Sequence, residues 1–310
     1  MKTGIIDMGT NTFHLLVAEW NSDGYQILHR DRIPVRVGVG GINQNIITIE
    51  GVERAVDALK HFKRKMDELG VARIFAFGTS ALRNASNSHE VISRIETATG
   101  ITAQLISGDE EALFIYEGVD LALTLGLEKT LVVDIGGGSV EFIIGDGKKV
   151  YWKQSFEVGA QRLLERFHKH DPILSSEMDM VMRSYKETLG PLFKAMQLHQ
   201  PRTLAGSSGT FDTLSEIYCY QSGIEPKDAP ETPLTTKAFY KIYPDIISKN
   251  RSDRMKIPGM IDMRVDMIVV ACCLVKFLLD SFRFDRFRVS SFSLKEGVLA
   301  ALMKGRLSAD

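Results

Sequence analysis

The feature that most constrains this chain is an internal repeat, residues 4–17 and 131–144. The first copy reads GIIDMGTNTFHLLV and the second reads LVVDIGGGSVEFII. Each copy is a short apolar strand that ends in an aspartate, a tight turn of glycine and small polar residues, and a second apolar strand. One constant shift aligns Asp7 with Asp134, Gly9 with Gly136 and Thr12 with Ser139. The repeat predicts two equivalent turns that face each other across a cleft and grip one row of phosphates.

The composition is that of an ordinary globular protein. The chain has 310 residues, of which 44% are apolar and 25% charged, a length that is natural for two domains. Its formal net charge is −1, so no global field attracts a nucleic-acid polymer or a membrane surface. A polyanionic ligand would therefore need local basic groups.

Cysteine usage and the apolar segments indicate a cytoplasmic protein. The three cysteines, Cys219, Cys272 and Cys273, have neither metal-ligand spacing nor the pattern of a disulfide framework. The N-terminal residues run directly into a strand and lack the apolar core of a signal peptide. The longest apolar run, residues 267–279, is interrupted by Lys276 and is too short to span a bilayer. We therefore expect a reducing compartment and no membrane partner.

Each half of the chain is predicted to begin with a three-stranded meander. The strands are residues 4–7, 13–20, 25–32, 131–134, 140–145 and 150–156, with a hairpin turn at 21–24. Helices are predicted at 52–69, 91–99, 107–123, 160–169, 176–196, 210–220, 236–249, 262–282 and 294–304. Further strands are predicted at 73–77, 102–106, 203–205 and 287–291, and loops at 78–87 and 222–234. This order indicates an α/β duplication with domains at 1–124 and 125–310, whose last helix can pack back on the first domain.

The first turn, IIDMGTNT, carries groups that suit a phosphate and a metal ion. Asp7 ends a buried strand, where its carboxylate can hold Mg²⁺ directly or through water. Gly9 lets the backbone approach a phosphate closely. Thr10, Asn11 and Thr12 offer hydroxyl, amide and backbone donors. A plain hairpin turn explains this copy equally well when it is considered alone.

The second turn, VVDIGGGSVE, is the stronger signal. Three consecutive glycines, residues 136–138, carry a high entropic cost on folding, and such a run favours a close anion held by backbone N–H groups. Asp134 and Glu141 are acidic residues near this loop and can share a metal ion with the phosphates. A solvated strand position is the alternative interpretation of Glu141.

Five motifs in this order carry a family resemblance: DMGTNTFH, GTSALRNA, SGDEEA, DIGGGSVE and AGSSGTFDTL. Together they resemble the exopolyphosphatase / guanosine pentaphosphate phosphatase family of the actin, sugar-kinase and heat-shock-ATPase superfamily, over essentially the whole chain. The resemblance implies two ribonuclease H-like (actin-like ATPase) α/β domains related by duplication, with an inter-domain cleft. It also implies a hydrolase that uses Mg²⁺ or another divalent cation and removes terminal phosphates from inorganic polyphosphate or from guanosine pentaphosphate (pppGpp).

The resemblance also implies roles for individual residues. The two phosphate clamps are the loops at residues 7–12 and 134–139, which include Gly9, Thr10, Asn11, Thr12, Gly136, Gly137, Gly138 and Ser139. Asp7, Asp134 and Glu141 match acidic positions implied in metal binding. Arg83 matches an arginine expected to reach the phosphates, for which a surface arginine is the alternative interpretation. His14 also fits the family's pattern, with a role either in packing or in a hydrogen bond that supports the first loop.

Glu111 is predicted to be the general base. Ser107 and Glu110 have the spacing of a capping box, which gives Glu110 a structural role at the start of a helix. Glu111 lies about 100° further round the helix and is left over from the cap. The family's catalytic glutamate directly precedes an alanine, as Glu111 precedes Ala112 here. A glutamate in that position can orient and deprotonate a water for in-line attack on the terminal phosphorus. Without the resemblance, a solvated glutamate is the alternative interpretation of Glu111.

The segment at 205–214, AGSSGTFDTL, is predicted to be a strand, a turn and a helix start that favours an anion. Its small residues Gly206, Ser207, Ser208, Gly209 and Thr210 can serve a guanosine ribose, a distal phosphate or only a tight helix–strand crossing. Among the basic residues, Arg264 resembles a family position near the cleft. The others, Arg251, Arg254, Lys256, Arg283, Arg286 and Arg288, are expected to be mostly solvated.

The chain departs from the family at a few points. Thr10 and Thr12 stand where serines are common, which keeps a hydroxyl. Residues 291–293 lack the usual Asp-Arg-Gly character, so a role for that loop is in doubt. Longer members carry extra C-terminal helical domains, so we expect weaker processivity or a preference for short polymers here.

Polyphosphate is the first predicted substrate and guanosine pentaphosphate the second. An ATP-dependent kinase of a small metabolite is an alternative, although such kinases usually rely on an aspartate as base. A non-catalytic alarmone or polyphosphate sensor and an actin-like assembling protein are further alternatives, and a homodimer is left open.

Overall fold

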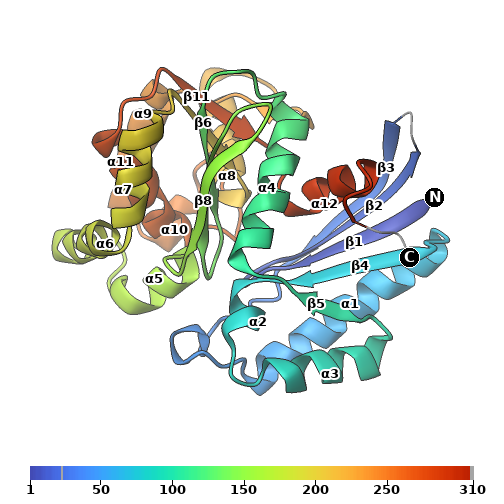
Figure 1. The fold of residues 1–310 in the computed structure, drawn as a ribbon. Helices are drawn as coiled ribbons and strands as arrows, with labels where there is room; N and C mark the ends of the chain where they lie inside the picture. Colours follow the sequence, from blue (N-terminus) through green and yellow to red (C-terminus); the bar gives the residue numbers. More distant parts are fainter. Residues whose placement is uncertain (22–23, 308–310) are drawn as a thin grey trace. The chain divides into compact units, whose positions relative to one another are not determined.

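The computed structural model describes residues 1–21 and 24–307. Within these ranges the chain forms two compact units (Figure 1). Unit 1 is Met1–Gly118 together with the C-terminal segment from Leu294, and unit 2 is Val119–Ser293. The predicted hairpin turn at 21–24 lies in part outside the described residues, because Ser22 and Asp23 are not among them.

Unit 1 is built on a five-stranded sheet with the order β3-β2-β1-β4-β5. The strands are β1 (Lys2–Met8), β2 (Phe13–Asn21), β3 (Gly24–Ile33), β4 (Arg73–Gly78) and β5 (Ala103–Leu105). Its helices are α1 (Ile49–Glu68), α2 (Ser80–Asn84), α3 (Ser88–Thr99), α12 (Leu294–Met303) and the first part of α4 (Gly108–Leu123), with a short 3₁₀ helix η1 at Ile42–Gln44. Figure 1 shows α1 and α3 on one face of this sheet and α12 on the other.

The helix predicted at 52–69 is confirmed as α1, which buries one apolar stripe. Val52, Val56, Leu59, Phe62 and Met66 are all buried, and they pack in one cluster with the apolar strand residues. The helix begins after Thr48, whose hydroxyl accepts the Gly51 amide, a typical N-cap contact.

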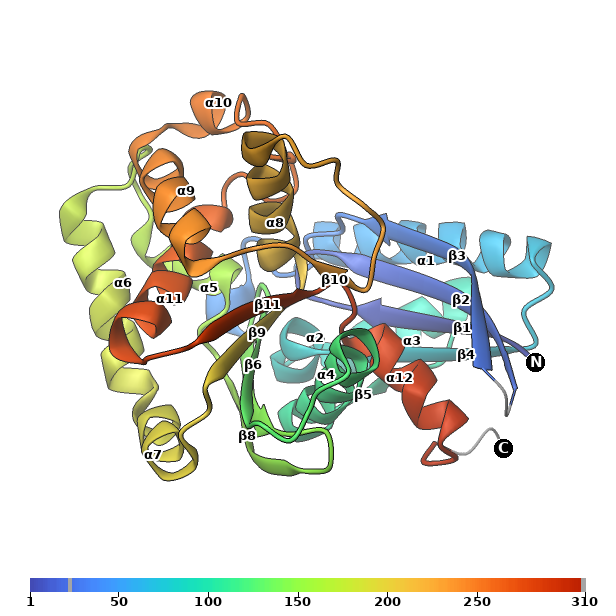
Figure 2. The same cartoon turned by 90° about the horizontal axis from the view of Figure 1, so that it is seen from above.

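Unit 2 is built on a six-stranded sheet with the order β10-β11-β9-β6-β7-β8. The strands are β6 (Thr130–Ile135), β7 (Val140–Gly145), β8 (Val150–Phe156), β9 (Thr203–Ser207), β10 (Glu231–Thr232) and β11 (Arg286–Ser290). Its helices are α5 (Ala160–Phe167), α6 (Ser175–Thr188), α7 (Gly190–His199), α8 (Gly209–Ser222), α9 (Thr236–Ser248), α10 (Arg251–Arg254) and α11 (Ile268–Ser281). Helix α8 packs on β9 and β11, and α11 packs on α6, α8 and α9 (Figure 2).

The predicted duplication is confirmed by strand order and register. In each unit the first strand pairs antiparallel with the second strand and parallel with the fourth. Asp7 lies opposite His14 in the first hairpin, and Asp134 lies opposite Glu141 in the second. The two hairpins therefore place the equivalent aspartate at the same point of the same local structure.

Some predicted elements are wrong in detail. The helix predicted at 176–196 is two helices, α6 and α7, because Pro191 has no N–H to continue the hydrogen-bond ladder and stands instead in the first turn of α7. The helix predicted from 262 begins at Ile268. The loops predicted at 78–87 and 222–234 contain α2 and the two-residue strand β10. Helix α10 was missed, although Asn250 caps it by accepting the Asp253 amide.

Within residues 1–21 and 24–307, none of the helices has the length and apolar character that a membrane span requires.

Candidate active site

The glycine loop of unit 2 turns its carbonyl groups toward the start of α5. The Gly136 oxygen accepts the Ala160 amide at 2.9 Å, and the Gly137 oxygen accepts the Gln161 amide at 2.9 Å. The Gly138 oxygen accepts the Gly159 amide at 3.1 Å. In a trans peptide the carbonyl and the following N–H point in opposite directions. The N–H groups of residues 137–139 therefore point away from α5, as three consecutive donors suited to an anion.

Gly159 makes this support possible. A Cβ atom at Gly159 would lie 2.4 Å from the carbonyl carbon of Gly138 and 2.5 Å from the carbonyl oxygen of Gly137. Gly159 itself has φ −63° and ψ 159°, a conformation open to any residue. Glycine is therefore required at position 159 because any side chain there would clash with the loop. The sequence alone did not predict this requirement.

The first loop is supported in the same way inside unit 1. The Thr10 oxygen accepts the Gly38 amide at 3.1 Å, and the Asn11 oxygen accepts the Arg36 amide at 2.8 Å. The following amides of Asn11 and Thr12 point the opposite way for the same reason. In both units the supporting amides come from the segment that follows the third strand, 36–38 after β3 and 159–161 after β8.

The equivalent glycines of the two hairpins are under the same constraint. A Cβ at Gly9 would lie 2.9 Å from the Thr12 oxygen, and a Cβ at Gly136 would lie 3.0 Å from the Ser139 oxygen. Both positions therefore need glycine to close the turn. The duplicated motif thus preserves the backbone geometry of the turn as well as its sequence pattern.

Asp134 and Glu141 form a buried carboxylate pair in unit 2. Their exposed fractions are 5% and 1%, and they lie opposite each other on β6 and β7. The interpretation of Glu141 as a solvated strand residue is therefore wrong. Asp134 accepts hydroxyl hydrogen bonds from Ser207 at 2.7 Å and Ser293 at 2.5 Å.

The donor chemistry of this pair fits a hard divalent cation. Among the described residues no group of three or more His, Cys, Asp and Glu side chains is arranged to hold a metal ion. Mg²⁺ usually takes one or two carboxylates together with phosphate oxygens and water, so two carboxylates beside a phosphate loop suffice. Asp134 and Glu141 would hold such an ion. Asp7 is half-buried at the equivalent point of the first hairpin, opposite His14.

Arg83 and Glu111, which were predicted separately, form an ion pair in unit 1. The Arg83 Nη1 lies 2.6 Å from the Glu111 Oε2 and also donates to the Ile106 carbonyl at 3.1 Å. Arg83 lies in the last turn of α2 and Glu111 lies in the first turn of α4. Both side chains are largely shielded from water, with exposed fractions of 17% and 9%. Neither is therefore a solvated surface residue, which was the alternative interpretation of each.

The capping box predicted before Glu111 is confirmed. The Glu110 carboxylate accepts the Ser107 amide at 2.9 Å and the Ser107 hydroxyl at 2.7 Å, and the Ser107 Oγ accepts the Glu110 amide at 3.2 Å. The hydrogen bond from the Ser107 backbone, followed by the one from its hydroxyl, lowers the pKa of Glu110. Glu110 thus has a structural role, and its neighbour Glu111 is left for other contacts.

Arg264 is brought against the start of α8. A Cβ at Gly209 would lie 2.2 Å from the Arg264 Nη2 and 2.3 Å from its Cζ, so the guanidinium rests on this glycine. Ser208, directly before it, has φ 74°, a strained value for a residue with a side chain. A cation beside the positive end of a helix creates a local field that favours an anion.

The other members of the 205–214 segment have separate structural roles. A Cβ at Gly206 would lie 2.1 Å from the Phe211 ring, so this glycine serves the tight helix–strand crossing. The Ser207 hydroxyl is used by Asp134, and Thr210 is buried in the first turn of α8. The segment therefore combines packing with the anion-favouring start of α8.

One basic residue expected to be solvated is buried instead. Arg254 has an exposed fraction of 1%, donates from Nε to the Val265 carbonyl at 2.9 Å and pairs with Asp171 at 2.6 Å. It holds the segment that carries Arg264. The sequence offered no signal for this burial, because three basic residues in a short loop resemble a surface run.

Two further serines at the carboxylates were not foreseen as site residues. Ser155 on β8 donates to Glu141 at 2.6 Å. Ser293 stands in the loop whose role was in doubt, yet its hydroxyl reaches Asp134.

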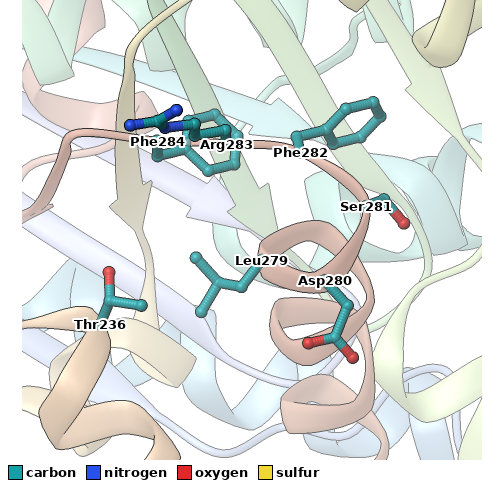
Figure 3. Close-up of a pocket in the computed structure, with 7 residues that line it drawn as sticks. All are labelled: Thr236, Leu279, Asp280, Ser281, Phe282, Arg283 and Phe284. Atoms are coloured by element: carbon teal, nitrogen blue, oxygen red, sulfur yellow. The ribbon is translucent and has the colours of Figure 1, made fainter.

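A separate open cavity of about 460 Å³ lies in unit 2 at the end of α11 (Figure 3). It is lined by Thr236, Leu279, Asp280, Ser281, Phe282, Arg283 and Phe284. None of the residues predicted from the sequence to bind phosphate or metal lines it.

Each unit thus carries a hairpin that ends in an aspartate and a loop whose backbone donors suit an anion. Residues 16–305 match the Ppx/GppA phosphatase family. The chain is similar to an exopolyphosphatase from Cytophaga hutchinsonii, with 41% identity, 98% of each chain covered and a TM-score of 0.96. It is also similar to the Aquifex aeolicus member of the Ppx/GppA family, with 25% identity, 99% of each chain covered and a TM-score of 0.79.

The chain therefore belongs to the Ppx/GppA phosphatase family and is a phosphoanhydride hydrolase. The family resemblance drawn from the five motifs is confirmed, as is the expected fold class of two actin-like α/β domains related by duplication.

Proposed function

We propose that this protein is an exopolyphosphatase that releases orthophosphate from the end of inorganic polyphosphate with the help of Mg²⁺ or another divalent cation. The observation that carries this proposal is the set of three outward amides at residues 137–139 next to the buried pair Asp134 and Glu141. Amide donors suit phosphate oxygens, and buried carboxylates suit a hard cation that accompanies them. Guanosine pentaphosphate is the second candidate substrate, since its 5′ terminus offers the same anhydride.

The two loops bind phosphate oxygens through backbone donors. In unit 2 these are the amides of Gly137, Gly138 and Ser139, and in unit 1 they are the amides of Asn11 and Thr12, supported by the hydroxyl of Thr10. Because the supporting segments fix the loops beforehand, the donors need little reorganisation when charge develops in the transition state.

A divalent cation held by Asp134 and Glu141 would neutralise charge on the phosphate oxygens, and Asp7 is a candidate metal ligand at the equivalent point of the first hairpin. The residues of the chain supply binding and orientation around it. Arg264 and the start of α8, residues 208–210, are suited to a more distant phosphate of the polymer, or to the ribose side of a guanosine nucleotide.

Glu111 orients and deprotonates the attacking water, and Arg83 stabilises charge on the transferred phosphoryl group. Before the substrate binds, these two side chains form an ion pair with each other. A phosphate that approaches Arg83 competes with the Glu111 carboxylate for the guanidinium, because both are anions that pair well with arginine. When Arg83 turns to the phosphate, the Glu111 carboxylate becomes available to a water molecule.

The substitution Glu111→Gln tests this assignment. It keeps the size of the side chain and removes the base, so we expect orthophosphate release from polyphosphate to fall by roughly 10²–10⁴-fold. The matched control is Glu110→Gln, one position earlier, which alters the cap and not the base. The control is expected to lose a small amount of stability and retain its activity. Near-normal turnover by a folded Glu111→Gln protein would mean that another group activates the water.

A further inference from the structure

The two buried carboxylates of unit 2 are held by hydroxyl groups that come from four separate segments. Glu141 Oε1 accepts hydrogen bonds from Ser139, in the loop before β7, and from Ser155 on β8, each at 2.6 Å. Asp134 Oδ2 accepts them from Ser207, at the end of β9, and from Ser293, which follows β11. Each carboxylate thus receives two donors on the same oxygen.

This pattern fixes the orientation of both groups. An ionised carboxylate is a pure acceptor, and two donors that converge on one oxygen restrict its rotation about the last side-chain bond. The donors are neutral hydroxyls, so they orient the carboxylates without cancelling their charge.

The fold brings the serines to their carboxylates in different ways. Ser139 and Ser155 lie near Glu141 because β7 is flanked by the hairpin loop and by β8. Ser207 lies beside Asp134 through the parallel pairing of β6 and β9, in which the two residues are register partners. Ser293 reaches the same oxygen from the far end of the unit's sequence.

We propose that Ser207 and Ser293 are positioning residues for Asp134, and that Ser139 and Ser155 are positioning residues for Glu141, so that the two carboxylates are aligned for a divalent cation. The inference rests on the proposed cation site of the preceding section. It gives a role to Ser293 and assigns the Ser139 hydroxyl to Glu141, while the Ser139 amide remains available to phosphate. Groups that orient metal ligands typically change metal affinity by about 10–100-fold when they are removed.

The test is a direct titration of the full chain with Mn²⁺ alone. Binding is monitored by calorimetry and by the electron paramagnetic resonance signal of free Mn²⁺. The variants Ser155→Ala and Ser293→Ala are each expected to bind Mn²⁺ about 10–100-fold more weakly than the unmodified chain. Ser293→Thr keeps the hydroxyl and is expected to restore binding. Ser215→Ala is the control. This buried serine donates to the Pro233 carbonyl at 2.8 Å and has no part in the proposed positioning of the two carboxylates.

Thermal unfolding of each variant is recorded first, and the half-buried Ser155 supplies the test if Ser293→Ala does not fold. Equal Mn²⁺ affinity in both alanine variants and the unmodified chain would overturn the positioning role. An unmodified chain that binds no Mn²⁺ would overturn it as well. Phosphate release by the unmodified chain is measured separately, so that either outcome is distinguished from a failure of the proposed function.

Discussion

Gly159→Ala is expected to damage phosphate binding, although residue 159 is not itself proposed to contact substrate. The added Cβ would lie 2.4 Å from the carbonyl carbon of Gly138 and 2.5 Å from the oxygen of Gly137. These are backbone atoms that cannot rotate away, and ordinary contact begins near 3.4 Å. The loop must therefore retreat by about 1 Å, a misplacement that is enough to cost about 10²-fold in rate.

That loss corresponds to about 2.7 kcal/mol of transition-state stabilisation, measured as kcat/KM for orthophosphate release. Overpacking is also expected to lower the free energy of unfolding by about 1–3 kcal/mol. The backbone at Gly159 is extended, so alanine adds no conformational strain of its own.

The control is Gly190→Ala at the start of α7, where an added Cβ meets no atom within 4 Å. The control is expected to keep both activity and stability. If Gly159→Ala retained the kcat/KM of Gly190→Ala, the loop would not depend on its contact with α5, and the reasoning about its fixed amides would be refuted.

Three further substitutions test the roles of buried or crowded groups. Arg254→Met should destabilise the fold by about 3 kcal/mol in urea unfolding, because it leaves a buried network incomplete, whereas Lys256→Met at an exposed pair should change stability by less than about 1 kcal/mol. Gly209→Ala should push the guanidinium of Arg264 aside and raise KM for polyphosphate with kcat little changed, since the clash is with the end of a flexible side chain. Burial raises the pKa of Glu177, but hydrogen bonds from a histidine and two backbone amides outweigh it and lower the pKa to about 2. Its stabilising effect is present above the unfolded pKa near 4.5 and is lost as pH falls toward 2, so Glu177→Gln should flatten the pH dependence of the unfolding temperature in that window.

The parts of the fold that a repeated local pattern encodes could be predicted from the sequence. The apolar strands on either side of each aspartate predicted the two hairpins, and the common shift between the copies predicted that the hairpins are equivalent. In the structure Asp7 pairs with His14 and Asp134 with Glu141 at the same point of each hairpin. The capping box at Ser107 was predictable for the same reason, because its partners are three residues apart.

Contacts between distant segments could not be predicted. Arg83 and Glu111 were each selected as site residues, but nothing in the spacing of the two motifs shows that one binds the other. The hydroxyl of Ser293 reaches Asp134 only because β9 lies between β6 and β11 in the sheet. From the sequence alone Arg254 cannot be distinguished from a surface charge, because only the fold shows which segments bury it.

The most direct test of the whole account is orthophosphate release by the unmodified chain from short polyphosphate, long polyphosphate and guanosine pentaphosphate, each with Mg²⁺ and with a chelator. The account predicts release from polyphosphate that requires the cation. Binding of polyphosphate without any release, or ATP consumed only when a second acceptor is added, would contradict it.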